Sequence, residues 1–221
     1  MSNQADNWEV YISTEGFESI RTDPRFAALL LLARVVNGIN FCFQTLIESI
    51  KDDTPAGQRQ HFNSFLFACG ILYEGLKVAN TLGKYFGDRK SFQNGFGLLL
   101  KDKVTKQLQQ TVLNSMRNKV AFHYDEDIVT GTLKNLNLSS YAFATAANSK
   151  SGAIYFKRAD EVAINFIIGE PGSKEEEQKV FREILESTSK VMTQFVRCAN
   201  ELITDVLKDM NWLRRKARKD C

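Results

Sequence analysis

Apolar residues recur at helical spacing in two long segments of the N-terminal half. After Asp23-Pro24, where an acidic N-cap precedes a proline at the first helical position, apolar side chains follow a period of about 3.6 residues as far as Asp52. Thr54-Pro55 repeats this start signal and opens a second apolar period that ends near Gly87-Asp88. Two long helices joined by so few residues predict an antiparallel pair.

The polar and glycine-containing residues 88–97 are typical of a loop. A third helical segment begins at residues 98–101 and continues to His123. Later in the chain, Ser173 with Glu176 three residues on forms a capping box. It opens a long final helix that we expect to include Trp212.

Two regions lack this helical period. In the N-terminal arm, residues 1–22, brief alternation predicts a short strand or an ordered arm and no core helix. In the insertion, residues 138–170, the segments Tyr141–Thr145 and Ala153–Phe156 flank a polar stretch and predict a small β-like hairpin. Ala159–Ile168 fits a helix or a strand, with helix favoured.

The pattern therefore predicts an all-α fold, a bundle of four to five helices with a small hairpin insertion, in a single domain over residues 1–221. Hydrophobic residues make up 43% of the chain and charged residues 25%, with a net charge of +3, values typical of a soluble globular protein. So weak a net charge does not by itself indicate a nucleic-acid-binding protein.

Cysteine usage and hydropathy predict a cytoplasmic location. The four cysteines form no C-x-x-C pair, and three of them, Cys42, Cys69 and Cys198, occupy apolar helical positions, as buried thiols of a reduced protein do. No secretory leader is evident. The most apolar stretch, Phe26 to Phe43, is interrupted by polar residues including Arg34, so we expect it to be a poor membrane span and the protein not to associate with membranes.

Most classes of catalytic site lack their residues. The two histidines, His61 and His123, are far apart, no cysteine accompanies either, and no Glu-x-x-His repeat occurs, so we expect no metal site. No phosphate-binding loop, dinucleotide fingerprint or nucleophile elbow is present, so we expect no cofactor.

What remains is metal-free acid–base chemistry centred on Arg117, Asn118 and His123. RNA carries its own nucleophile, the 2′-hydroxyl group. A histidine can move protons and an arginine can stabilise charge on the phosphoryl oxygens, while a neighbouring amide orients either group or the phosphate. These three residues are chemically sufficient for metal-independent cleavage of RNA.

Arg117-Asn118 followed by His123, late in an all-α bundle, resembles the R-x(4–6)-H motif of the HEPN superfamily. Five residues separate the arginine from the histidine, and the adjacent amide matches the common R-N start of the motif. The resemblance implies a homodimeric helical-bundle ribonuclease, of the toxin or phage-defence type, with Arg117, Asn118 and His123 as the catalytic set and the two motifs meeting at a cleft. It also implies an antitoxin or a nucleotidyltransferase as partner. Tyr124 directly follows His123 and departs from the H-x-Y spacing of the members modified by such a transferase, so that control is not carried over.

Helix geometry adds a condition. On an ideal α-helix, residues six apart differ by about 240° in direction and about 9 Å in rise. Arg117 and His123 would then not share a face. Either the helix loosens before His123, or a second chain completes the site across a two-fold axis.

Other residues are candidates for contacts with the RNA backbone, namely Lys119, Tyr124, Arg214 and Arg215. The basic cluster at 214–219 has a structural alternative, since cations at the end of a helix favour its dipole. Lys119 and Tyr124 also fit solvent exposure and packing, and His61 fits a surface position. At the level of function, a non-catalytic module that binds RNA, a nucleotide or a protein, and a purely structural dimer, stay open.

Overall fold

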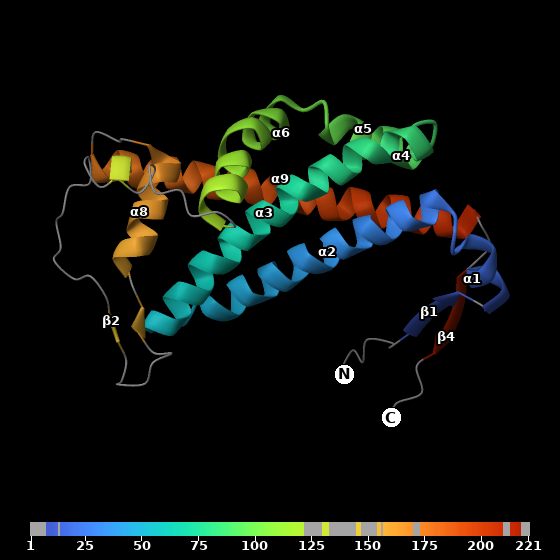
Figure 1. The fold of residues 1–221 in the computed structure, drawn as a ribbon, viewed down its shortest axis with the longest axis horizontal. Coiled ribbons are helices and arrows are strands. Elements are labelled where there is room, and N and C mark those ends of the chain that lie inside the picture. Colours follow the sequence, from blue (N-terminus) through green and yellow to red (C-terminus); the bar gives the residue numbers. More distant parts are fainter. Residues whose placement is uncertain are drawn as a thin grey trace, which may run out of the picture.

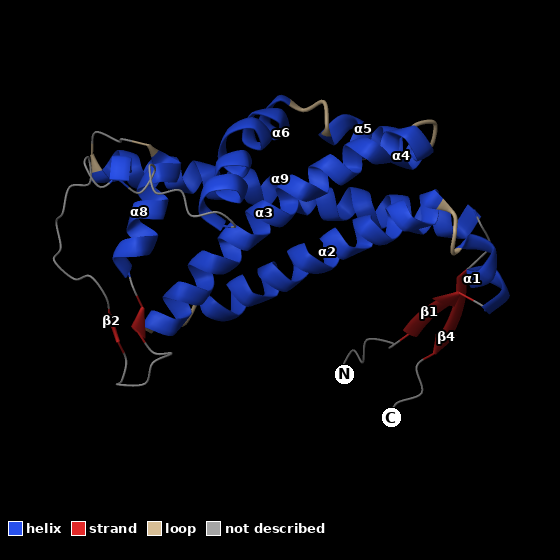
Figure 2. Ribbon diagram, in the orientation of Figure 1, coloured by secondary structure: helices blue, strands red, loops and turns tan. Residues whose placement is uncertain are grey.

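The computed structural model describes residues 8–12, 14–121, 130–132, 145–146, 154–155, 157–169, 173–209 and 213–217. These residues form an all-α fold in which three long helices, α2, α3 and α9, run along the length of the molecule (Figures 1 and 2). The strands are two short antiparallel pairs.

The first two long helices begin where the sequence predicts. α2 spans Pro24–Ser49, and the side chain of its N-cap Asp23 accepts a hydrogen bond of 2.8 Å from the backbone N–H of Arg25. α3 spans Pro55–Phe86, and the hydroxyl of its N-cap Thr54 accepts a hydrogen bond of 3.2 Å from the backbone N–H of Gly57. The two helices pack against each other as the predicted antiparallel pair (Figure 1).

α9, Lys174–Asp209, lies against both of them and closes the core. The serine of the predicted capping box caps the helix start, because the backbone N–H of Glu176 donates to the Ser173 hydroxyl at 3.2 Å. The aromatic ring of Phe195 on α9 is fully buried and contacts Phe96 edge-on, with 5.2 Å between ring centroids. The core therefore extends from the α2–α3 pair across α9 to the segment that follows α3.

Gly75 marks the closest approach of the three long helices. A Cβ added there would lie 2.6 Å from Val35 Cγ1 on α2 and 2.9 Å from Phe195 Cζ on α9. Both distances are shorter than packed side chains allow, so only a glycine permits this packing.

We expect Gly75→Ala to lower the free energy of unfolding by about 1–3 kcal/mol, since overpacking a tight core outweighs the gain in helix propensity. The matched control is Gly83→Ala on the same helix, where the nearest atom, Phe92 Cζ, is 3.5 Å from the added Cβ. This control should stabilise α3 by about 0.5–1 kcal/mol. Urea unfolding followed by circular dichroism measures both, and equal effects of the two substitutions would contradict this account of Gly75.

The predicted loop at residues 88–97 is wrong. It contains the short helices α4, Lys90–Asn94, and α5, Phe96–Leu99. Phe92 and Phe96 are buried in the core, and this tertiary packing stabilises helical turns that local composition does not favour. The third long segment begins with α6, Lys103–Leu108, slightly later than predicted, because the Asp102 carboxylate caps it by accepting from the backbone N–H of Thr105 at 2.8 Å.

The ends of the chain also differ from the prediction. A short helix, α1, spans Thr14–Ile20 and buries Ile20, although no core helix was expected in the N-terminal arm. β1, Trp8–Ile12, takes the strand alternative and pairs antiparallel with β4, Leu213–Ala217. α9 is described as far as Asp209, and Trp212, which was expected in this helix, lies outside the described residues. From Leu213 the chain pairs with a strand from the opposite end of the sequence.

In the insertion, α8 spans Lys157–Ile168, which confirms the favoured helix. β2, Thr145–Ala146, pairs with β3, Ile154–Tyr155, and the polar stretch between them lies outside the described residues. The predicted bundle of four to five helices counted only the long helical segments. The described residues add the short helices α1, α4 and α5.

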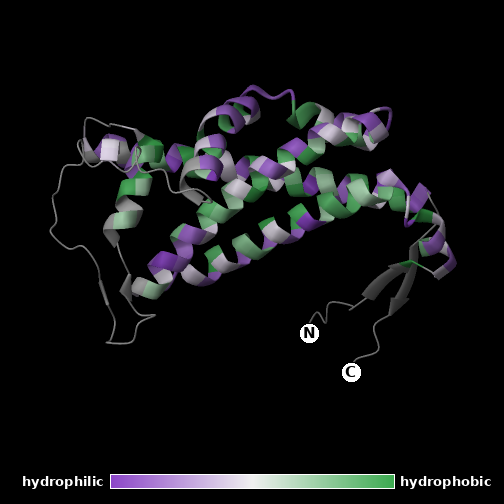
Figure 3. Cartoon of the chain, viewed as in Figure 1, coloured by the Kyte–Doolittle hydropathy of each residue, from purple (hydrophilic) through white to green (hydrophobic). Residues whose placement is uncertain are grey.

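α2 and α3 are long and apolar enough to cross a membrane by length and composition, although the stretch from Phe26 to Phe43 was expected to be a poor span. Core helices of soluble proteins pass the same test, so this is weak evidence. Figure 3 shows hydrophobic positions along both helices with hydrophilic positions between them. The cytoplasmic location stays a prediction.

Candidate functional site

The segment that carries Arg117 and Asn118 is a widened helix. After α6, the chain forms two π-helical stretches, η1 over Gln109–Leu113 and η2 over Met116–Ala121. Such turns bond from residue i to i+5 and occur frequently at functional sites. Leu113 and Met116 are fully buried and fix the segment to the core. The helix therefore loosens before His123, which was one of the two alternatives set by the motif spacing, although His123 itself lies outside the described residues.

Arg117 is held on two sides. Its Nη1 donates a hydrogen bond of 2.6 Å to Asn118 Oδ1, and Asn118 Nδ2 donates in turn to Asn114 Oδ1 at 2.6 Å. Its Nε lies 2.9 Å from Oε1 of Glu74 on α3. An arginine has five N–H donors in a rigid fork, so part of this guanidinium has no partner among the described residues.

Glu74 is the anchor of Arg117. Its Oε1 is shielded from solvent and accepts no well-aligned hydrogen bond from the described residues, so the contact with Arg117 is an ion pair. Its Oε2 lies 3.3 Å from Lys77 Nζ, one turn further along α3. The Glu74 side chain as a whole is 42% exposed, so solvent weakens the ion pair, which orients the Arg117 side chain together with the hydrogen bond to Asn118.

A pocket of about 360 Å³ lies beside this ion pair. Its wall comes from α2, α3 and η2, and consists of Arg34, Val35, Gly38, Gly70, Ile71, Glu74 and Arg117. At Gly38, a Cβ would lie 3.1 Å from Ile71 Cδ1, so the absence of a side chain there allows α2 and α3 to pack closely beside the pocket. The volume suits a small ligand of nucleotide size, and the two arginines outweigh the single carboxylate in the lining.

Arg34 and Glu74 were not predicted as site residues. In the sequence, Arg34 only interrupts an apolar stretch and Glu74 is one acidic residue of a long helix. A charged residue inside a strongly apolar helical run is a usable signal, because burial of that face would be costly without a function or a partner. Which arginine, carboxylate and pocket come together is decided by the packing of α2, α3 and η2.

The structure brings Arg117 and Asn118 together and leaves the other predicted residues elsewhere or undescribed. Lys119 lies in η2, but its side chain is not described, and His123 and Tyr124 lie outside the described residues. Arg214 and Arg215 lie in β4, opposite Tyr11 and Val10 of β1. They are therefore not at the helix end that the structural alternative assumed. That strand pair lies beside α1, far along the long axis from the turns that follow α6 (Figure 1). The two arginines are therefore not adjacent to Arg117.

The remaining candidates for chemistry are structural. His61 is half-buried, with Nδ1 3.3 Å from the hydroxyl of the buried Ser49, so the surface position predicted for it is wrong in part. Cys42, Cys69 and Cys198 are buried and free, as predicted, and burial raises the pKa of each thiol, that of Cys69 far above its usual range. A protonated, enclosed thiol is a poor nucleophile.

Within the described part of the chain, no three His, Cys, Asp or Glu side chains are grouped so that they could hold a metal ion. The site described above combines two arginines, one carboxylate and an amide beside a pocket. No protein-family model, no curated protein and no solved structure matches this chain.

Proposed function

We propose that this protein is a metal-independent endoribonuclease whose site is built around Arg117. The observation that carries the proposal is that Glu74 and Asn118 hold the Arg117 guanidinium at the wall of a nucleotide-sized pocket, with some of its donors unpaired among the described residues. A preorganised guanidinium is the group that stabilises charge developing on a phosphoryl oxygen, and holding it in place in advance removes the cost of reorganisation.

The roles follow from the chemistry of the side chains. The 2′-hydroxyl of the RNA attacks the adjacent phosphorus, the bond to the 5′-oxygen breaks, and the products carry a 2′,3′-cyclic phosphate and a 5′-hydroxyl. His123 takes or gives the proton, Arg117 stabilises the pentacoordinate phosphorus and Asn118 orients Arg117. No metal and no cofactor take part.

The proposal extends to the biological setting implied by the HEPN-like motif. It is a cytoplasmic homodimer of the toxin or phage-defence type, with an antitoxin or a nucleotidyltransferase as partner. The two-fold axis lies next to the end of η2, so that the motifs of both chains meet, and Lys119 contributes to contacts with the RNA backbone.

The direct test is cleavage of a single-stranded RNA in excess EDTA. We expect products with 2′,3′-cyclic phosphate and 5′-hydroxyl ends, identified by mass spectrometry, and no cleavage of the same sequence with 2′-O-methyl groups, because the nucleophile is then blocked. His123→Ala should lose the activity. Cleavage that needs Mg²⁺, or that continues on the 2′-O-methyl oligonucleotide, would exclude this mechanism.

A second candidate function is non-catalytic binding. It is favoured by the ion pair of Arg117 with Glu74, which already neutralises much of the arginine charge. A module of this kind would bind RNA, a nucleotide or a protein at the pocket without turnover. Binding of cleavable RNA that stays intact after long incubation would favour it.

A further inference from the structure

Beyond the pocket, the surface of the α2–α3 pair carries two exposed phenylalanines, Phe41 and Phe67, and the surface from the pocket to these residues is called the α2–α3 groove. The contacts of the pair fix its register, with Val35 opposite Gly75 and Gly38 opposite Ile71. Phe41 follows Gly38 by three positions on α2, and Phe67 precedes Gly70 by three positions on α3. Both phenylalanines therefore lie at one end of the groove, and the arginines lie at the other.

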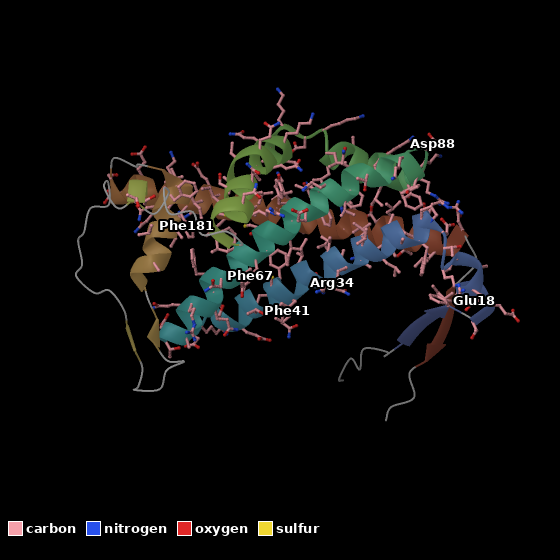
Figure 4. All side chains as sticks on the ribbon, viewed as in Figure 1. Glu18, Arg34, Phe41, Phe67, Asp88 and Phe181 are labelled. Carbon is pink, nitrogen blue, oxygen red and sulfur yellow. The ribbon has the colours of Figure 1, made fainter. Side chains whose placement is uncertain are left out.

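Both rings reach solvent. Phe41 is 70% exposed and Phe67 is 43% exposed, and on α3 the residues on either side of Phe67, Leu66 and Ala68, are buried. Figure 4 shows Arg34 and Phe41 along α2 and Phe67 on the adjacent α3. On α2, Phe41 follows Arg34 by seven positions, which is about two helical turns, so both side chains lie on one helix face about 10 Å apart.

The charges at the other end favour an anion. Arg34 is exposed and carries no ion pair among the described residues, and Arg117 keeps unpaired donors. The opposing charge is Glu74, which is itself flanked by Lys77. Three cations and one carboxylate leave a net positive charge, which matches a phosphodiester.

We propose that the α2–α3 groove binds single-stranded RNA, with a phosphate between Arg34 and Arg117 and a base stacked on Phe41. The proposal deepens the ribonuclease function and rests on it for the identity of the ligand. Cationic grooves lined by aromatic rings are the general means of binding single strands, since every base has a face that can stack.

Charge favours RNA over a second copy of the chain as the occupant. An apolar face with exposed phenylalanines also suits a dimer contact. A contact of this surface with a second copy would enclose Arg34, and the acid that lines the pocket, Glu74, already pairs with Arg117. An RNA phosphate supplies the negative charge that such a contact lacks, and it is attracted by both arginines.

The test measures binding separately from cleavage. Fluorescence anisotropy with a 2′-O-methyl oligonucleotide, which cannot be cut, gives the dissociation constant as a function of salt. We expect Arg34→Ala to weaken binding at least about tenfold and to reduce the salt slope by about one, as the loss of one phosphate contact does. Phe41→Ala should weaken binding by about five- to 150-fold with little change in slope, as the loss of a stacked base does.

Matched controls are available on exposed surfaces outside the groove. Arg197→Ala on α9 removes an exposed arginine, and Ile47→Ala removes an equally exposed apolar side chain from another face of α2. Both should bind the oligonucleotide like the wild type. Thermal unfolding of each variant excludes loss of fold as the cause.

The outcomes separate the groove from the proposed reaction. If Arg34→Ala and Phe41→Ala bind as tightly as the controls, the groove proposal is wrong even if the wild type cleaves RNA. If both weaken binding but the wild type leaves cleavable RNA intact, the groove proposal stands and the ribonuclease proposal fails. If Phe41→Ala turns a dimer into a monomer while RNA binding is unchanged, the occupant is a second copy and the groove proposal is overturned.

Discussion

Replacing Arg117 by alanine is expected to lower kcat for RNA cleavage by about a hundredfold to a thousandfold, the loss that follows removal of one preorganised group facing the developing charge. The effect should fall mainly on kcat, because the guanidinium acts most strongly on the pentacoordinate phosphorus, and less on KM, to which other cations contribute. Single-turnover cleavage in EDTA, with enzyme in excess, measures it without interference from product release.

Arg117→Lys distinguishes geometry from charge. A lysine keeps the positive charge but has no planar fork, so it cannot face Glu74 and Asn118 together and still present donors to a phosphate. We therefore expect it to recover only a small part of the activity. Full activity in Arg117→Lys would show that charge alone suffices and that the ion pair with Glu74 has no positioning role.

The principal control concerns stability. Arg117→Ala removes the ion pair of Glu74, whose side chain is 42% exposed and still faces Lys77, so we expect only a small loss of stability from the lost pair. The double variant Arg117→Ala with Glu74→Gln also removes the Glu74 charge. If the double variant regains stability but not activity, the loss is catalytic; if it regains activity, Arg117 serves the fold and not the reaction.

The helix starts were predictable because their chemistry is local. Asp23, Thr54 and Ser173 each cap the helix that follows with a side-chain oxygen, and a proline at the next position or a glutamate three residues on completes the signal. Such signals involve only neighbours in the sequence. They are therefore present in the sequence pattern before any tertiary contact is known.

The errors occurred where distant residues decide the structure. The short helices α4 and α5 depend on the burial of Phe92 and Phe96 against the core, and β4 depends on a partner strand from the opposite end of the chain. The same holds for the site. The motif singles out Arg117 and Asn118, but Arg34 and Glu74 join them only through the packing of α2 and α3, which the sequence period does not specify in register.

The widening of the helix at η2 bears on how the site is completed. A π-helix has about 4.4 residues per turn, so six positions correspond to about one and a third turns and still leave two residues on different faces. The wider turns over Met116–Ala121 therefore change the angle at which a residue six positions after Arg117 leaves the helix. They do not by themselves place it on the same face as Arg117. A second chain stays the simpler way to bring an arginine and a histidine to one phosphate.

Mixing the Arg117→Ala and His123→Ala variants is accordingly expected to restore RNA cleavage from two preparations that are each inactive. If every site takes its arginine from one subunit and its histidine from the other, a mixed dimer holds one complete site and one empty site. Random exchange of subunits makes about half of the dimers mixed, so the activity should reach about a quarter of the wild-type value. Native mass spectrometry of the mixture establishes that exchange has occurred. If exchange is complete and the mixture stays inactive, each site lies within one chain, and the loosened helix at η2 must then turn His123 toward Arg117 without help from a partner.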